Sequence, residues 1–137
     1  MGVVKQCSVL VINSTGRATT YPATLQKVGF RVIETCEWPA DETILAFEVV
    51  IVQLRDMAAV PMLAARLRAK PHFGHRVLIG ITPGSTSAGD RRSAVTSGFD
   101  DVVEESQPRV MVARILRQLR ARPEHRCYLP DLKRHAA

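Results

Sequence analysis

The run Glu48–Leu54, EVVIVQL, constrains the fold of this chain more than any other segment. Its four consecutive aliphatic residues predict a strand buried on both faces of a sheet. Further strands are predicted at Cys7–Ile12, Arg31–Cys36 and Arg76–Ile81, and a brief last one at Val102–Val103. Short, nearly continuous apolar runs of this kind are typical of a parallel sheet covered by helices.

Helical segments alternate with these strands. We expect helices at Tyr21–Val28 and Val60–Lys70, a segment of two turns at most at Asp41–Phe47, a short helix that ends near Ser97, and a last helix from Ser106 to about Arg122. The apolar residues of the last helix recur on one face, at Val112, Ile115, Leu116 and Leu119. Five alternating βα units with right-handed crossovers predict a doubly wound α/β sandwich.

The chain length of 137 residues fits one domain. We expect that domain over residues 1–122 and a mostly polar tail over residues 123–137. No segment has the length of a membrane span, and the N-terminus lacks the pattern of a secretion signal, so we expect a cytoplasmic protein. The three cysteines, Cys7, Cys36 and Cys127, have no metal-binding spacing, and an odd number favours free thiols.

Polar residues follow the predicted strands. In a doubly wound sheet the functional crevice lies at the carboxyl ends of the strands. Those ends fall at Asn13-Ser14, Gln53, Thr82 and Glu104-Glu105. The sequence therefore predicts that these residues lie at one edge of the sheet.

Five fragments of the chain, in order and with similar spacing, resemble the CheY-like receiver domains of bacterial response regulators. They are LQKVGFRVIE, FEVVIVQLRDM, ARLRAKPHFGHRVLIGIT, SGFDDVV and SQPRVMVARILRQL, and the resemblance covers about residues 7–122. It implies a flavodoxin-like (βα)5 three-layer sandwich with a five-stranded parallel sheet. It also implies signal transduction in a two-component or phosphorelay-type system. The second helix region, Trp38–Phe47, is short for the family.

The resemblance implies a phosphorylation chemistry that this sequence lacks at most positions. In receivers, two acids after the first strand and an aspartate after the third hold magnesium, and that aspartate accepts the phosphoryl group. The acids fall here at Asn13 and Ser14, and the aspartate falls at Gln53, whose amide cannot form an acyl phosphate. The lysine after the fifth strand falls at Glu105, and only the hydroxyl residue, Thr82, keeps its type. We therefore expect a pseudo-receiver that is not an enzyme and has no metal or cofactor.

Two alternatives remain for this crevice. Asp56 could be a residual phosphoacceptor if the third strand ran three residues longer. The loop Ser14–Thr19 also resembles the phosphate loop of flavodoxins, and it could bind an anion or a flavin phosphate. The simpler interpretation is a polar turn with a Ser/Thr helix cap. The candidate anion-binding residues are Ser14, Thr15, Gly16, Arg17, Arg55 and Thr82.

The net charge is +6, and ten lysines and arginines follow residue 90. Arg114, Arg117 and Arg120 lie off the apolar stripe of the last helix. In receivers this helix often mediates dimers or output contacts, so we expect a signalling protein partner or a homodimer through its face. A solvated surface is the simplest alternative. Nucleic acid is disfavoured because the chain has 5% aromatic residues and no recognisable reader motif.

Overall fold

The computed structural model describes residues 7–16, 19–53, 60–70, 73, 76–82, 88–104 and 108–121. Strands and helices alternate along them. The elements are β1 (Ser8–Asn13), α1 (Tyr21–Lys27), β2 (Arg31–Thr35), α2 (Asp41–Leu45), β3 (Val49–Gln53), α3 (Val60–Arg68), β4 (Val77–Thr82), α4 (Ala88–Thr96), β5 (Asp101–Glu104) and α5 (Pro108–Arg120). Every predicted strand and helix is present, with ends shifted by a few residues.

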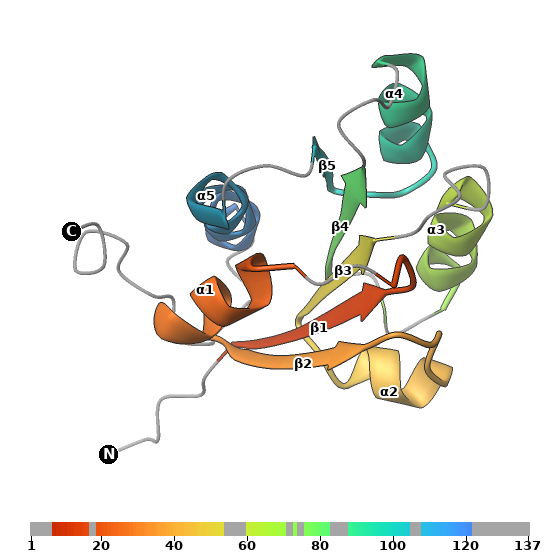
Figure 1. The fold of residues 1–137 in the computed structure, drawn as a ribbon. Coiled ribbons are helices and arrows are strands. Elements are labelled where there is room, and N and C mark those ends of the chain that lie inside the picture. The colour runs from red at the N-terminus through yellow and green to blue at the C-terminus, as the bar shows by residue number, and fades with distance from the viewer. Residues whose placement is uncertain are drawn as a thin grey trace.

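The five strands form one parallel sheet in the order β2-β1-β3-β4-β5 (Figure 1). This arrangement confirms the doubly wound, three-layer (βα)5 sandwich. β1 and β3 are neighbours, and their last residues, Asn13 and Gln53, are paired in register. β2 lies at one edge of the sheet and β5 at the other.

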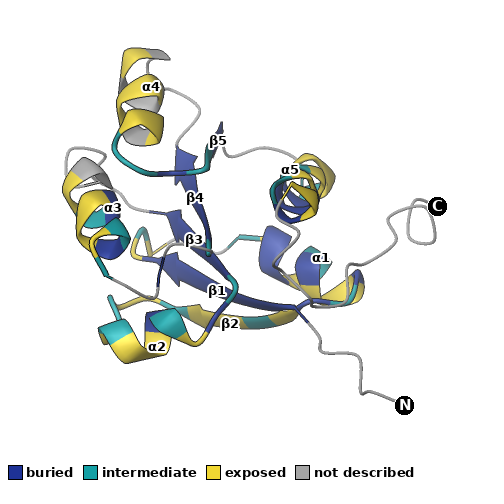
Figure 2. Cartoon of the chain, turned by 180° about the vertical axis from the view of Figure 1, so that it is seen from behind, coloured by how far each residue is buried: buried dark blue, intermediate teal, exposed yellow. Residues whose placement is uncertain are grey.

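Successive apolar side chains along each strand point to opposite faces of the sheet. They form two hydrophobic cores, one on each face. Val9, Val11 and Ile51 pack with the apolar faces of α1 and α5. The predicted stripe of α5 is buried there, together with Met111. α1 and α5 therefore cover the same face of the sheet (Figure 2).

The second core lies on the opposite face. Leu10, Ile12 and Val50 pack there with Ile44 of α2 and Leu67 of α3. Because the central strands have a core on each face, they are buried throughout, as their sequences predict. The edge strand β2 differs, since Ile33 at its centre is 44% exposed.

Glycines follow two of the helices. Gly29 follows α1 with φ 112°, and Gly98 follows α4 with φ 131°. These angles strain any side chain with a Cβ atom, so glycine suits both positions. α2 has only five residues, in agreement with the short second helix region.

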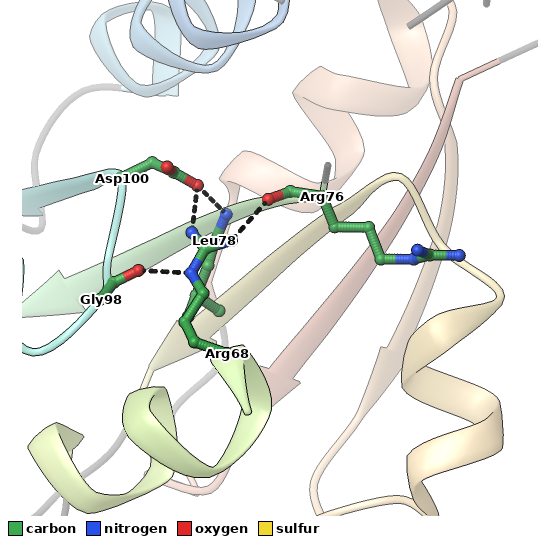
Figure 3. Close-up of polar contacts among 5 residues, drawn as sticks. All are labelled: Arg68, Arg76, Leu78, Gly98 and Asp100. Atoms are coloured by element: carbon green, nitrogen blue, oxygen red, sulfur yellow. Dashed lines mark hydrogen bonds and ion pairs between the residues drawn. The ribbon is translucent and has the colours of Figure 1, made fainter. Parts of the chain in front are cut away.

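A network around Arg68 joins α3 to the segments that precede β4 and β5 (Figure 3). The Arg68 guanidinium donates from Nε to the Gly98 carbonyl at 2.8 Å, from Nη1 to the Arg76 carbonyl at 3.1 Å, and from Nη2 to Asp100 Oδ2 at 2.7 Å. Asp100 Oδ2 also accepts from the Leu78 amide at 2.7 Å. This network lies at the amino ends of the strands. The predicted crevice lies at their carboxyl ends, at the opposite end of the sheet.

The cysteines differ from the expectation of free thiols. Cys36 is free and exposed, but Cys7 is disulfide-bonded, so that expectation is wrong for Cys7. Spacing along a sequence does not reveal which thiols meet in space. Cys127 and the predicted tail, 123–137, lie outside the described residues. In the part of the chain that is described, no helix has the length and apolarity needed to cross a membrane.

Candidate functional site

The three central strands end in polar side chains. These side chains are buried at the end of the sheet where the carboxyl ends of the strands meet. Asn13, Gln53 and Thr82 end β1, β3 and β4 and are 6%, 3% and 0% exposed. The Ser14 amide donates to the Gln53 carbonyl at 3.1 Å, so the hydrogen bonding between β1 and β3 continues to Ser14. The structure therefore brings together Asn13, Gln53 and Thr82, which the sequence predicts at the carboxyl ends of the strands. Buried polar groups need partners, so their hydrogen bonds define what this edge can do.

Gln53 is held by a residue that the sequence does not single out. Tyr21, the first residue of α1, donates its hydroxyl to Gln53 Oε1 at 2.9 Å, and this bond is buried. The ring of Tyr21 belongs to the core between α1, α5 and the sheet. The amide oxygen of Gln53 is thus occupied from within the molecule.

Asn13 organises the start of the loop between β1 and α1. Its Oδ1 accepts hydrogen bonds from the Thr15 amide at 3.1 Å and from Thr15 Oγ1 at 2.6 Å. A side chain that bonds two residues ahead forms an Asx turn, and Gly16 continues this turn with φ 77°. The expected polar turn is therefore present. The expected cap is not, because Thr20 makes no side-chain capping bond to α1.

Two hydroxyl groups near this edge are buried without hydrogen-bond partners in the described part of the chain. They are Thr82 Oγ1, at the end of β4, and Thr19 Oγ1, in the segment before α1. An unpaired buried hydroxyl costs free energy because it has lost its hydrogen bonds to water. These two hydroxyl groups are neutral donors that contacts among the described residues do not use.

The described residues of this edge do not fit a magnesium site. Mg²⁺ takes oxygen ligands, usually with one or two carboxylates among them. Asn13 and Gln53 have neutral amide oxygens, and both already accept internal hydrogen bonds. Glu104 ends β5, which is separated from β1 by β3 and β4. Among the described residues, no three histidine, cysteine or acidic side chains form a metal-binding group.

Several candidates lie outside the described residues. They are Arg17, Arg55, Asp56 and Glu105. Their roles remain predictions. Ser14 and Gly16, by contrast, are exposed in the loop, and Thr15 is half-buried against Asn13.

The three arginines predicted as an interface differ in their surroundings. Arg114 forms an ion pair from Nε to Asp101 Oδ2 at 3.1 Å, which ties α5 to the start of β5. Arg117 and Arg120 are exposed and make no ion pair with another described residue. The free basic surface of α5 is therefore centred on Arg117 and Arg120.

Two kinds of contact, one at the candidate site and one at the opposite end of the sheet, escape sequence reasoning for the same reason. Tyr21 has the position of an ordinary apolar residue in the first turn of a helix, and nothing in its neighbours marks the hydroxyl as functional. Asp100 precedes β5 and Asp101 begins it, and each carboxylate binds an arginine of a helix, Arg68 of α3 and Arg114 of α5. Tyr21 and Gln53 are 32 residues apart, so the fold is needed to pair them.

Comparison with known proteins finds solved structures that have the same fold as this chain. No protein-family model and no curated protein matches the sequence. The solved structures that resemble it include a response regulator from Thermotoga maritima (TM-score 0.71, 17% identity, covering 84% of this chain and 98% of that one). They also include HP1043, an orphan response regulator of H. pylori (TM-score 0.68, 18% identity, covering 85% and 99%).

A third structure is described as an atypical orphan response regulator with a phosphorylation-independent regulatory mechanism. It has a TM-score of 0.66 and 20% identity and covers 82% of this chain and 95% of that one. All three likenesses rest on fold, since fewer than one residue in four is identical. The chain has the flavodoxin-like fold of CheY-like response-regulator receiver domains.

Proposed function

We propose that this chain is a receiver-like signalling module that acts through protein–protein contacts without aspartyl phosphorylation. The observation that supports the proposal is the position of Gln53 and the hydrogen bond that its side chain makes. It ends β3, where a receiver has its phosphoacceptor, and its amide oxygen accepts the Tyr21 hydroxyl. The proposed setting is a two-component or phosphorelay-type system in the bacterial cytoplasm.

Chemistry supports this proposal. Phosphoryl transfer to a receiver needs a carboxylate nucleophile and a metal-assisted charge balance. Asn13 and Ser14 are neutral, so the residues beside Gln53 do not supply the usual magnesium ligands. One structural neighbour is described as regulated independently of phosphorylation, and another is described as an orphan regulator. A chain of this fold can therefore signal by another route.

The proposed contact surface is the exposed face of α5. It presents Arg117 and Arg120, with Arg109 one turn or more away on the same helix. Val110, which is 47% exposed, adds an apolar contact. Aliphatic and arginine side chains together are common in protein interfaces. We propose a signalling protein or a second copy of the chain as the partner.

Phosphorylation is tested by incubation with acetyl phosphate and magnesium, followed at once by intact-mass measurement. We expect no phosphoryl adduct. An Asp56→Asn variant is the matched control, and a receiver with an intact aspartate verifies the reagents. A stable adduct on the native chain that disappears in Asp56→Asn would overturn the proposal and identify Asp56 as the acceptor.

A second function has one observation in its favour. The Thr82 hydroxyl is a buried donor that has no partner among the described residues, and a donor of this kind suits an anion or a flavin phosphate. Titration with sulfate, phosphate and nucleotides, followed by the fluorescence of the single tryptophan, Trp38, tests this alternative. No change at millimolar concentrations, and no yellow colour on purification, would remove it.

A further inference from the structure

Charge is segregated along this chain into an acidic and a basic segment. Residues 32–54 contain five acids and no lysine or arginine. α5 contains four arginines and no acid. The two segments occupy different parts of the fold, so their separation in sequence becomes a separation in space.

The acidic surface lies along the edge strand and the segment that follows it. Glu34 of β2, Glu37 of the next loop and Glu42 of α2 are exposed, and none forms an ion pair with another described residue. We call these three residues the acidic edge. Asp41 is excluded because Lys70 binds it at 2.9 Å. Ile33, at 44% exposure, gives the same edge an apolar contact.

The basic surface lies on α5 and on the end of its neighbour α1. Arg109, Arg117 and Arg120 are exposed, as is Lys27 in the last turn of α1. We call Lys27, Arg117 and Arg120, which all lie in last turns, the basic face; Arg109 lies in the first turn of α5 and is not part of it. Because α1 and α5 pack together and both follow strands of a parallel sheet, their last turns lie at the same end of the molecule.

The two surfaces cannot neutralise each other within one molecule. α5 packs on β4 and β5, whereas the acidic edge begins on β2, at the other side of the sheet (Figure 1). Unpaired charges of opposite sign then face outward in different directions. A second copy of the chain can bring an acidic edge against a basic face.

We propose that copies of this chain associate head to tail, with the acidic edge of one copy on the basic face of the next. The proposal rests on the proposed function, because it names the partner of the α5 surface. Each contact is heterologous, so every bound copy presents a free acidic edge or basic face for another. Charge complementarity sets the direction of the contact, and Ile33 and Val110 supply apolar area at its two sides.

The test is sedimentation velocity over a concentration series at low salt. The acidic-edge variant carries Glu34→Gln and Glu37→Gln, and the basic-face variant carries Arg117→Gln and Arg120→Gln. We expect the native chain to form oligomers that grow with concentration, and each variant alone to associate at least about tenfold more weakly, a loss of about 1.4 kcal/mol. Arg92→Gln, which neutralises an exposed arginine of α4 outside both surfaces, should associate like the native chain.

Mixing the two variants gives the decisive result. The intact basic face of one variant fits the intact acidic edge of the other, so an equimolar mixture should form a 1:1 dimer that grows no further. If only the basic-face variant loses association, the contact is a symmetric dimer through α5, and the head-to-tail inference fails while the proposed function stands. A native chain that stays monomeric throughout also overturns the inference, and the phosphorylation assay remains independent of that outcome.

Discussion

The Tyr21 hydroxyl and Gln53 Oε1 form a buried hydrogen bond of 2.9 Å that fastens the first residue of α1 to the last residue of β3. This bond occupies the amide oxygen of the residue that ends β3. It also satisfies a polar atom at the end of a strand whose other side chains are apolar. Internal contacts therefore stabilise the side chain of Gln53.

The first prediction concerns this bond. Tyr21→Phe keeps the ring in the core but leaves Gln53 Oε1 without its donor. We expect the free energy of unfolding to fall by about 1–3 kcal/mol, the usual effect of a buried acceptor that has lost its partner. Urea denaturation followed by circular dichroism measures the change.

A double variant separates the hydrogen bond from the packing of the ring. In Tyr21→Phe/Gln53→Leu both partners are apolar, so neither side of this hydrogen bond is left unpaired. We expect this variant to recover most of the stability that Tyr21→Phe loses. Equal or greater destabilisation of the double variant would show that the hydrogen bond is not the source of the effect.

The second prediction tests whether an acid alone restores receiver chemistry. Gln53→Asp places a carboxyl group in a buried position beside neutral Asn13, so burial raises its pKa above the ordinary value of about 3.9. The charged form is then disfavoured in the folded state. The destabilisation should be small below pH 4 and should grow as the pH rises toward the raised pKa. Acetyl phosphate should still give no adduct, because the other magnesium ligands are missing.

Gln53→Asn is the matched control for this variant. It shortens the side chain equally but adds no charge, so its destabilisation should not depend on pH between 4 and 8. Denaturation curves for both variants across this range give the comparison. A pH-independent difference between them, or a phosphoryl adduct on Gln53→Asp, would contradict the prediction.

The fold and the place of the site were predictable from the sequence because their signals are local. Four aliphatic residues in Val49–Val52 mark a buried strand wherever they occur, and Gln53 after them marks where that strand ends. The parallel order then places Asn13 beside Gln53. The hydrogen bonds were not predictable, because they depend on how helices lie on the sheet. Tyr21 reaches Gln53, and Arg68 reaches Asp100, only through packing between distant segments.

The third prediction concerns the Arg68 network at the amino edge of the sheet. Arg68→Ala removes three hydrogen bonds and leaves the partly buried Asp100 carboxylate with fewer donors. We expect a loss of about 2–4 kcal/mol in the free energy of unfolding, since bonds to charged and poorly hydrated groups are the stronger ones. Thermal and urea denaturation should both show that Arg68→Ala is less stable than the native chain.

Arg66 of the same helix provides the control for this variant. Its side chain is 57% exposed, and its nearest carboxylate oxygen, on Asp41, is 3.7 Å away. Arg66→Ala should therefore change stability by no more than about 1 kcal/mol, as is usual for exposed ion pairs. Similar losses in both variants would mean that helix propensity or surface charge, rather than the network, explains the effect of Arg68→Ala.

The last prediction uses the contact between Asp41 and Lys70. The hydrogen bond from Lys70, at 2.9 Å, lowers the pKa of Asp41 below its ordinary value of 3.8, and the charges of Lys70 and Arg66 add to this effect. Because the pKa of Asp41 is lower in the folded state, its ionised carboxylate stabilises the fold at pH values above the ordinary pKa of 3.8. This stabilisation disappears as the pH falls through the lowered pKa. Asp41→Asn should therefore be less stable than the native chain at pH 7, and the two should converge as the pH falls through the lowered pKa of Asp41. Urea denaturation at pH 7, 5, 3 and 2 measures the gap, and a gap that stays constant would exclude the Asp41 charge as its cause.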